Sequence, residues 1–156
     1  MRGGDILTRV EKSIEIKAPP EKVWSISSWE RIPEYFETVK KVEWTSEEKN
    51  KIGATLHITG EVGGTKAEYD VEITELVENE KTAFRTTGGN ITLSAHSILS
   101  PTKDGTKITY VEEYELPYSV LGKIIDKLRV RKAIEKDAER ALEKLKLSFN
   151  LACAGF

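Results

Sequence analysis

The chain has 156 residues, a length that suits one domain spanning residues 1–156. Its 24 basic and 26 acidic residues are interspersed and give a formal net charge of −2, so no basic stripe predicts binding to nucleic acid. Hydrophobic residues make up 38% of the chain, enough for the core of a soluble protein, and its many Lys and Glu residues with a single Met resemble a thermophile's composition.

Signals for membrane insertion or export do not stand out in the sequence. No run of 18 apolar residues is present, so no integral membrane association is predicted. Residues 1–12 do not have the apolar segment of a secretion signal, so we expect a cytoplasmic protein. Cys153 is the single cysteine, which excludes an intrachain disulfide, and we expect it to have no role.

The N-terminal third of the chain predicts a strand followed by two short helices. The strand ends at Pro19 and Pro20, which favour the start of an amphipathic helix through Val23 and Trp24. A second short helix is expected near residues 33–36. The residues that alternate onto one face of the strand are Val10, Ile14 and Ile16.

Five to six further strands are predicted up to Pro117, joined as an antiparallel meander. Glycine-containing turns separate them, at Gly63-Gly64, Gly88-Gly89 and Asp104-Gly105. The clearest alternation follows the first of these turns, where one face is apolar and the other acidic. The residues expected to point inward there are Ala67, Tyr69, Val71 and Ile73.

The period changes after Pro117 and predicts one long C-terminal helix, Tyr118 to Phe149, which contains no proline. Two apolar stripes follow it, rotated by roughly a quarter turn, so the helix must bend or lie on a curved surface to bury both. The first stripe is Leu121, Ile124, Ile125 and Leu128. The second stripe is Ile134, Ala138, Ala141, Leu142, Leu145 and Phe149. Between the stripes, Arg131 and Glu135 are four residues apart and can pair.

This order of elements resembles the helix-grip fold of the START and birch-pollen-allergen superfamily, and within it the polyketide cyclase/dehydrase-like group. Four stretches carry the resemblance, which extends over about residues 10–147: APPEKVW (18–24), IPEYF (32–36), IGA (52–54) and DGTKITYVEEYELP (104–117). It implies an α+β fold in which a seven-stranded antiparallel sheet wraps around the long helix, with two short helices after the first strand. It also implies a cavity between sheet and helix that holds an apolar or amphipathic molecule, and we expect this cavity along Leu121 to Glu135.

One carboxylate is expected to point into that cavity. Glu112 shares its strand face with apolar and aromatic residues, Tyr110 and Tyr114 among them. An inward carboxylate needs a partner, and Arg131 or a tyrosine hydroxyl can supply it. The pair is either a structural ion pair or a ligand anchor. The candidate cavity residues are Trp29, Tyr69, Tyr110, Glu112, Tyr114, Leu121, Ile124, Ile125, Leu128, Arg131 and Glu135.

Most of the other candidate residues are expected to have structural rather than chemical roles. His57 and His96 alternate onto the outer face, and no spacing of His or Cys indicates a metal site, so neither a metal nor a cofactor is expected. The glycine pairs are turns rather than phosphate loops. Trp24 is expected in the core, and Trp29 at the mouth of the cavity, where it could act as a gate.

Three classes of function fit this pattern. The first is a carrier or sensor that binds a small hydrophobic ligand such as a lipid, an isoprenoid or a polyketide-like molecule. The second is an enzyme of the cyclase or dehydratase type, in which Glu112 or a tyrosine moves protons. The third is a protein-interaction module, such as a chaperone co-factor, that uses the outer face of the sheet. The sequence identifies no catalytic residue and leaves the ligand and the oligomeric state open.

Overall fold

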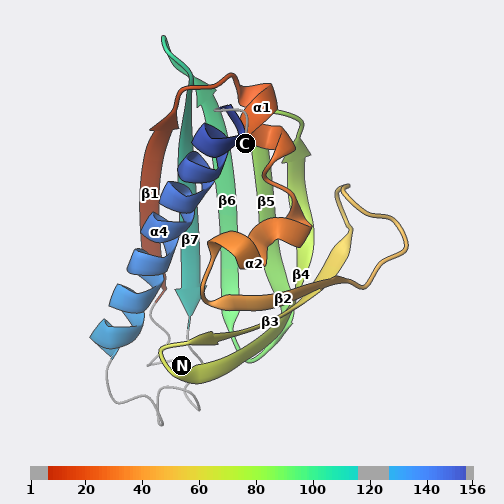
Figure 1. The fold of residues 1–156 in the computed structure, drawn as a ribbon. Coiled ribbons are helices and arrows are strands. Elements are labelled where there is room, and N and C mark those ends of the chain that lie inside the picture. The colour runs from red at the N-terminus through yellow and green to blue at the C-terminus, as the bar shows by residue number, and fades with distance from the viewer. Residues whose placement is uncertain (1–6, 116–126, 154–156) are drawn as a thin grey trace.

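The computed structural model describes residues 7–115 and 127–153 (Figure 1). Within them, seven strands form one antiparallel sheet in the order β1-β7-β6-β5-β4-β3-β2. The strands are β1 (Thr8–Ile16), β2 (Val39–Trp44), β3 (Thr55–Val62), β4 (Thr65–Val77), β5 (Lys81–Gly89), β6 (Thr92–Pro101) and β7 (Thr106–Glu115). The helices are α1 (Pro20–Ser25), the 3-10 helix η1 (Trp29–Arg31), α2 (Ile32–Tyr35) and α4 (Lys127–Cys153).

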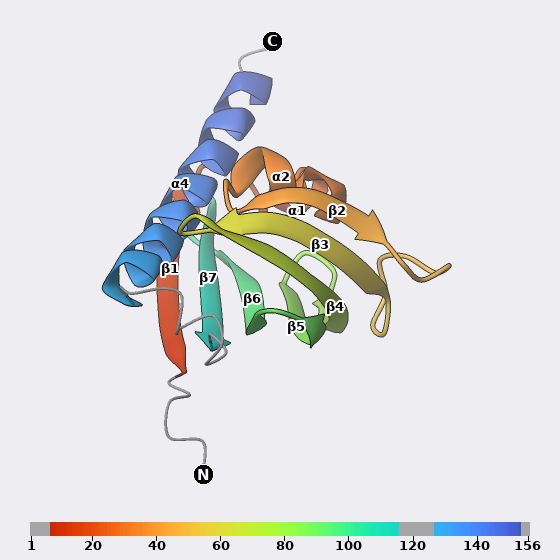
Figure 2. The same ribbon diagram turned by 90° about the horizontal axis from the view of Figure 1, so that it is seen from below.

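The sheet is strongly curled, which creates the space for a site. Figure 2 shows β2 and β3 folding back toward α4, so the sheet has a U-shaped section with α4 along its open side. The first and second strands lie at opposite edges, so the chain must cross the concave face between them. That crossing carries α1, η1 and α2, which close the concave face next to α4. The predicted helix-grip architecture is confirmed.

The alternation of the strands places their apolar residues on the concave face. In β4, Tyr69 and Val71 are buried whereas the intervening Asp70 is only partly buried. Two hydrophobic clusters result, one where α4 covers β1, β6 and β7, and one where the η1 segment covers β3 and β4. The cavity described below lies between these two clusters.

Over the described residues of α4, one apolar stripe is buried, and Leu128 is the one residue of the first predicted stripe that the structure tests. Its second predicted stripe, Ile134 to Phe149, is buried as expected. Leu128 of the first predicted stripe is instead 57% exposed, and Val130 takes the buried position at 1% exposure. Val130 contacts the β3–β4 turn, where its side chain would lie 3.4 Å from a Cβ at Gly63. With Val130 facing this turn, Leu128 lies on the exposed side of the helix.

The bounds of this helix also depart from the expected ones. Leu121, Ile124 and Ile125 lie outside the described residues, as does the expected helix start at Tyr118. At the other end α4 continues to Cys153, one turn beyond the predicted end at Phe149. None of the described helices is apolar over enough residues to span a membrane.

Candidate functional site

A cavity lies inside the curl of the sheet, with walls formed by the α1–α2 segment, the concave strand faces and α4. The centres of water molecules could occupy about 190 Å³ of it, far more than one buried water requires. Its walls are mainly aliphatic and aromatic, with a few hydroxyls. The two charged side chains among the described lining residues are Glu112 and Asp137.

Glu112 points into this cavity from β7. Tyr110, two residues away on the same strand face, donates a hydrogen bond from its hydroxyl to Glu112 Oε1 at 2.6 Å. The carboxyl group lies deep in the molecule, yet the side chain is only partly buried because it faces the cavity. Tyr110 is its one hydrogen-bond partner among the described residues, and Oε2 has no partner among them.

The surroundings of Glu112 shift its protonation into the neutral range. Burial away from water raises the pKa of this carboxyl to about 7, because the charged form loses its hydration. That value includes two smaller influences: the hydrogen bond from Tyr110 lowers the pKa, and the negative charge of Asp137 raises it. Near pH 7, Glu112 can therefore either accept or donate a proton.

Three tyrosines form the polar part of the cavity wall. Tyr69, Tyr110 and Tyr114 are all buried and all line the cavity, from β4 and β7. Burial is the largest influence on each hydroxyl and raises the pKa of all three, so they stay protonated and act as hydrogen-bond donors. The ring of Phe36 packs against that of Tyr110 with centroids 5.3 Å apart.

Asp137 of α4 is a site residue that sequence reasoning missed. It is buried and accepts three hydrogen bonds from the loop before β2: Glu37 N at 2.6 Å, Thr38 N at 3.2 Å and Thr38 Oγ1 at 2.5 Å. These bonds tie the helix to the loop that closes the cavity. The signal was present in the sequence, because Asp137 occupies a position on the apolar stripe between Ile134 and Ala141.

The same loop is also held from the sheet side. A Cβ at Gly60 of β3 would lie 1.8 Å from the carbonyl oxygen of Thr38, so only glycine allows this approach. That carbonyl accepts a hydrogen bond from Glu61 N at 3.0 Å. The loop therefore sits between α4 and β3 with little freedom to move.

Tryptophans border the cavity on the α1–η1 side. Trp29 is buried, lines the cavity and meets Phe84 edge to face with ring centroids 5.5 Å apart. Trp24 packs against the core, as expected, and also lines the cavity. The role of Trp29 as a gate stays a prediction.

Arg131 does not hold Glu112. Its side chain is 53% exposed on α4 and pairs with Glu135, with Arg131 Nε 2.9 Å from Glu135 Oε1. The pairing along the helix was expected, whereas the partnership of Arg131 with Glu112 is wrong. The tyrosine alternative is the one observed, through Tyr110. The reason is the rotation of α4, which directs Arg131 toward solvent.

The cavity also contacts a different part of α4 from the one expected. Of the described residues in the predicted segment up to Glu135, only Ile134 lines it, while Leu128, Arg131 and Glu135 do not. The helix residues that line the cavity are Ile134, Asp137, Ala141, Leu142 and Leu145. The single buried stripe explains the difference, because its small residue Ala141 leaves space beside the sheet.

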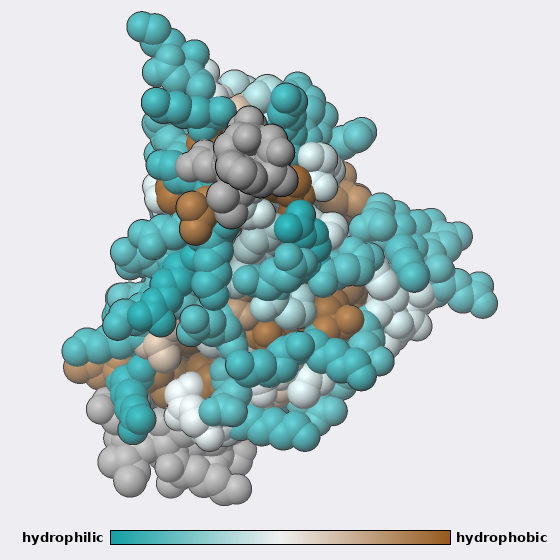
Figure 3. All heavy atoms as spheres, viewed as in Figure 1, coloured by the Kyte–Doolittle hydropathy of each residue, from teal (hydrophilic) through white to brown (hydrophobic). Residues whose placement is uncertain are grey.

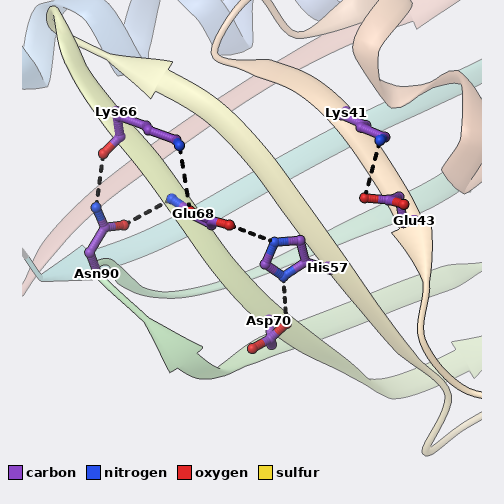
Figure 4. Close-up of polar contacts among 7 residues, drawn as sticks. All are labelled: Lys41, Glu43, His57, Lys66, Glu68, Asp70 and Asn90. Atoms are coloured by element: carbon purple, nitrogen blue, oxygen red, sulfur yellow. Dashed lines mark hydrogen bonds and ion pairs between the residues drawn. The ribbon is translucent and has the colours of Figure 1, made fainter.

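The histidines lie outside the cavity, as the alternation predicted. His57 is on the outer face of β3, with Nδ1 2.7 Å from Asp70 Oδ1 and Nε2 3.1 Å from Glu68 Oε1 (Figure 4). These two carboxylates raise the pKa of His57, with Asp70 the larger influence. Among the described residues, no cluster of His, Cys, Asp and Glu is arranged to hold a metal ion.

One face of the molecule shows few hydrophobic atoms at its surface. On the face seen in Figure 3, hydrophilic side chains cover most of the described surface, and hydrophobic atoms show mainly in the gaps between them. The cavity combines apolar walls with tyrosine hydroxyls and with Glu112, one oxygen of which has no partner among the described residues.

Known proteins share both this sequence pattern and this fold. Residues 8–149 match the family described as "Polyketide cyclase / dehydrase and lipid transport". An uncharacterized 17.2 kDa protein of Streptomyces lincolnensis, encoded in the melC2-rnhH intergenic region, is 28% identical over 140 residues, covering 86% of this chain and 87% of that protein.

Solved structures agree at the level of the fold. TTHA0849 from Thermus thermophilus superposes with a TM-score of 0.76 at 22% identity, covering 93% of this chain and 99% of that one. The Zhui aromatase/cyclase from Streptomyces sp. R1128 superposes with a TM-score of 0.74 at 13% identity, covering 92% of this chain and 93% of that one. The resemblance to the START and birch-pollen-allergen superfamily is confirmed. The chain belongs to the polyketide cyclase/dehydrase and lipid transport family.

Proposed function

We propose that the protein binds a small apolar or amphipathic molecule in the cavity between the sheet and α4, as a carrier or sensor. The observation that supports this most directly is the cavity itself, whose walls are apolar apart from a few hydroxyls and two carboxylates. Binding sites for small organic molecules typically combine such walls with a few placed polar groups. The family description, which includes lipid transport, supports the same role.

A dye and a pair of serine variants test this proposal. The uncharged dye N-phenyl-1-naphthylamine should gain fluorescence on entering the cavity, with micromolar affinity. Ser97 lines the cavity from β6, so Ser97→Phe should fill part of it and abolish the gain. Ser94 is exposed on the same strand and gives the matched control, because Ser94→Phe adds the same ring outside the cavity.

The natural ligand can be sought in the same variants. Native mass spectrometry of freshly purified protein should detect a bound molecule in the unmodified chain and in Ser94→Phe, and none in Ser97→Phe. Dye binding that is equal in all three proteins would contradict a ligand site in the cavity.

A second candidate function is proton transfer in a cyclase or dehydratase reaction. It is favoured by the 2.6 Å hydrogen bond between Tyr110 and Glu112 and by the raised pKa of Glu112, about 7. A carboxylate with that pKa can take a proton from a carbon beside a carbonyl group and return it after rearrangement. Such an enzyme also needs a ligand cavity, so the two candidates differ only in whether a reaction follows binding.

Deuterium exchange distinguishes the two candidates. In D2O, the enzyme should accelerate the loss of the α-proton signal of an aromatic ketone such as 1-tetralone, and Glu112→Gln should abolish the acceleration. A protein that binds the ketone without a reaction should broaden the ketone signals, while the exchange of the α-protons stays at its spontaneous rate.

A further inference from the structure

The charges lining the cavity favour one class of ligand over others. The charged side chains among the described lining residues are both acidic, Glu112 on β7 and Asp137 on α4. No described lysine, arginine or histidine side chain lines the cavity. A ligand with its own carboxylate or phosphate would therefore meet like charge in surroundings where water screens it weakly.

Asp137 and Glu112 differ in what they offer to a ligand. Both oxygens of Asp137 already accept hydrogen bonds from the loop before β2, so this residue contributes its negative charge rather than a free acceptor. Glu112 has one oxygen engaged by Tyr110 and the other without a described partner. An inward carboxylate with a free oxygen is suited to pair with a positively charged group.

Aromatic rings beside Glu112 add to this preference. Tyr110, its hydrogen-bond partner, packs against Phe36, and both rings line the cavity. The electron-rich faces of such rings attract cations, and a carboxylate surrounded by aromatic rings is a common arrangement for binding an ammonium group.

We propose that the cavity selects amphiphiles whose polar end is a cation, such as a primary amine, and disfavours those that end in a carboxylate, with Glu112 as the specificity-determining residue. This proposal rests on the proposed function, because it assumes that the cavity binds a ligand. The apolar walls hold the body of the molecule, and its cationic end lies against Glu112 Oε2.

The preference should depend on pH, because Glu112 changes its charge in the neutral range. Its pKa is about 7, so the carboxylate is present at pH 8 and largely protonated at pH 6. The titratable groups that face it are Tyr110 and Tyr114 of β7, Tyr69 of β4 and Asp137 of α4. The neighbours paired with it on β1 and β6, Val10 and Ala95, are uncharged.

Three probes with the same ten-carbon tail test the proposal: decylamine, 1-decanol and decanoate. Each competes with N-phenyl-1-naphthylamine for the folded protein at pH 8 and pH 6. Amines and carboxylic acids titrate far from this range, so the probes keep their charges. At pH 8, decylamine should bind at least about tenfold more tightly than decanoate, with decanol between them. This difference should shrink at pH 6.

Two variants with the same change of charge assign the effect to the cavity. Glu112→Gln should abolish the difference between decylamine and decanoate. Glu113→Gln changes the neighbouring residue, which alternates onto the outer face, and should leave the difference unchanged. The thermal midpoint of each variant, measured alongside, shows that it is folded.

The remaining outcomes separate this proposal from the proposed function. Decanoate that competes as well as decylamine, or a preference that persists in Glu112→Gln, would overturn the charge selection and leave ligand binding standing. Failure of the dye and of all three probes to bind would overturn ligand binding itself, and the selection with it.

Discussion

At the scale of single residues, the charged form of Glu112 is costly, because the carboxylate loses its hydration inside the fold. Its pKa is raised to about 7 from 4.5, so its protonated form is favoured in the folded state relative to the unfolded chain. A group of this kind gives stability that is complete below pH 4.5 and is lost as the pH rises through about 7. At pH 8 the loss amounts to at most about 3 kcal/mol.

Glu112→Gln should therefore stabilise the protein at pH 8. Glutamine keeps an acceptor for the hydroxyl of Tyr110 and removes the buried charge, so the free energy of unfolding should rise by about 1–3 kcal/mol at pH 8. At pH 4 the variant and the original should differ little. Urea unfolding at the two pH values measures this, with Glu113→Gln as control. A variant that is less stable at pH 8 would mean that Glu112 has a cationic partner.

Substitution of Asp137 should instead destabilise the protein, because its carboxylate accepts three hydrogen bonds. Asp137→Asn replaces one carboxylate oxygen with an NH2 group, so the side chain can no longer accept from Glu37 N and from Thr38 N together, because these donors bond to different oxygens of Asp137. We expect a loss of about 2–3 kcal/mol in the free energy of unfolding, seen as a lower urea midpoint. Glu139→Gln is the matched control, since Glu139 is exposed on the same helix. An equal effect of both changes would show that the bonds to the loop contribute nothing.

At this scale, the sequence predicted side-chain positions only where the backbone geometry of a strand decides to which face of the sheet a side chain points. Strand alternation placed Glu112 and the three tyrosines on the concave face, and placed His57 outside. It could not identify the partner of Glu112, because a contact between a strand and a helix depends on how the helix is rotated. Asp137 was missed because its three donors come from a loop about a hundred residues away in the sequence.

At the scale of elements, the strands were predictable and the rotation of α4 was not. Period-two alternation and glycine-containing turns define each strand locally, so the meander from β3 to β7 follows from short stretches. Helical periodicity placed Leu128 on an apolar stripe, but it does not tell which side of the helix faces the sheet at that point. Val130 is the buried residue there and contacts the turn at Gly63, a contact between distant parts of the chain.

A pair of truncations on α4 tests this rotation. Val130 is 1% exposed, so Val130→Ala should lower the free energy of unfolding by about 2 kcal/mol through lost burial. Leu128 is 57% exposed, so Leu128→Ala should change it by less than about 0.5 kcal/mol although it removes more atoms. Chemical denaturation of both variants measures the contrast. A larger loss of stability in Leu128→Ala than in Val130→Ala would show that Leu128, and not Val130, is the buried residue.

At the scale of the whole molecule, the curl of the sheet and the position of α4 create a cavity that no single element contains. The resemblance to a known fold predicted that cavity, whereas its size and its charged lining depend on side chains from the short helices, strands β2 to β7 and α4. A molecule that binds in the cavity of the folded state alone would also stabilise the fold.

The dependence of stability on pH is also a property of the whole molecule. Besides Glu112, His57 has a raised pKa, because Asp70 and Glu68 favour its charged form. Its contribution is complete below pH 6.5 and is lost as the pH rises through the higher pKa of the folded state. Glu30 has the opposite effect on the pH dependence of stability, because the hydrogen bond from Trp44 lowers its pKa. The stability that Glu30 contributes is lost as the pH falls through that lowered pKa.

Stability should therefore be greatest on the acidic side of neutrality, near pH 5, and should decline toward pH 8. Thermal midpoints measured from pH 4 to pH 9 should show this decline in the original protein. Glu112→Gln should remove the decline of the thermal midpoint between pH 5 and 7, and His57→Gln should remove the decline above pH 6.5. The thermal midpoint of the double variant should therefore change little from pH 5 to pH 8. A maximum at pH 8 in the original protein would show that neither group is perturbed in the direction described.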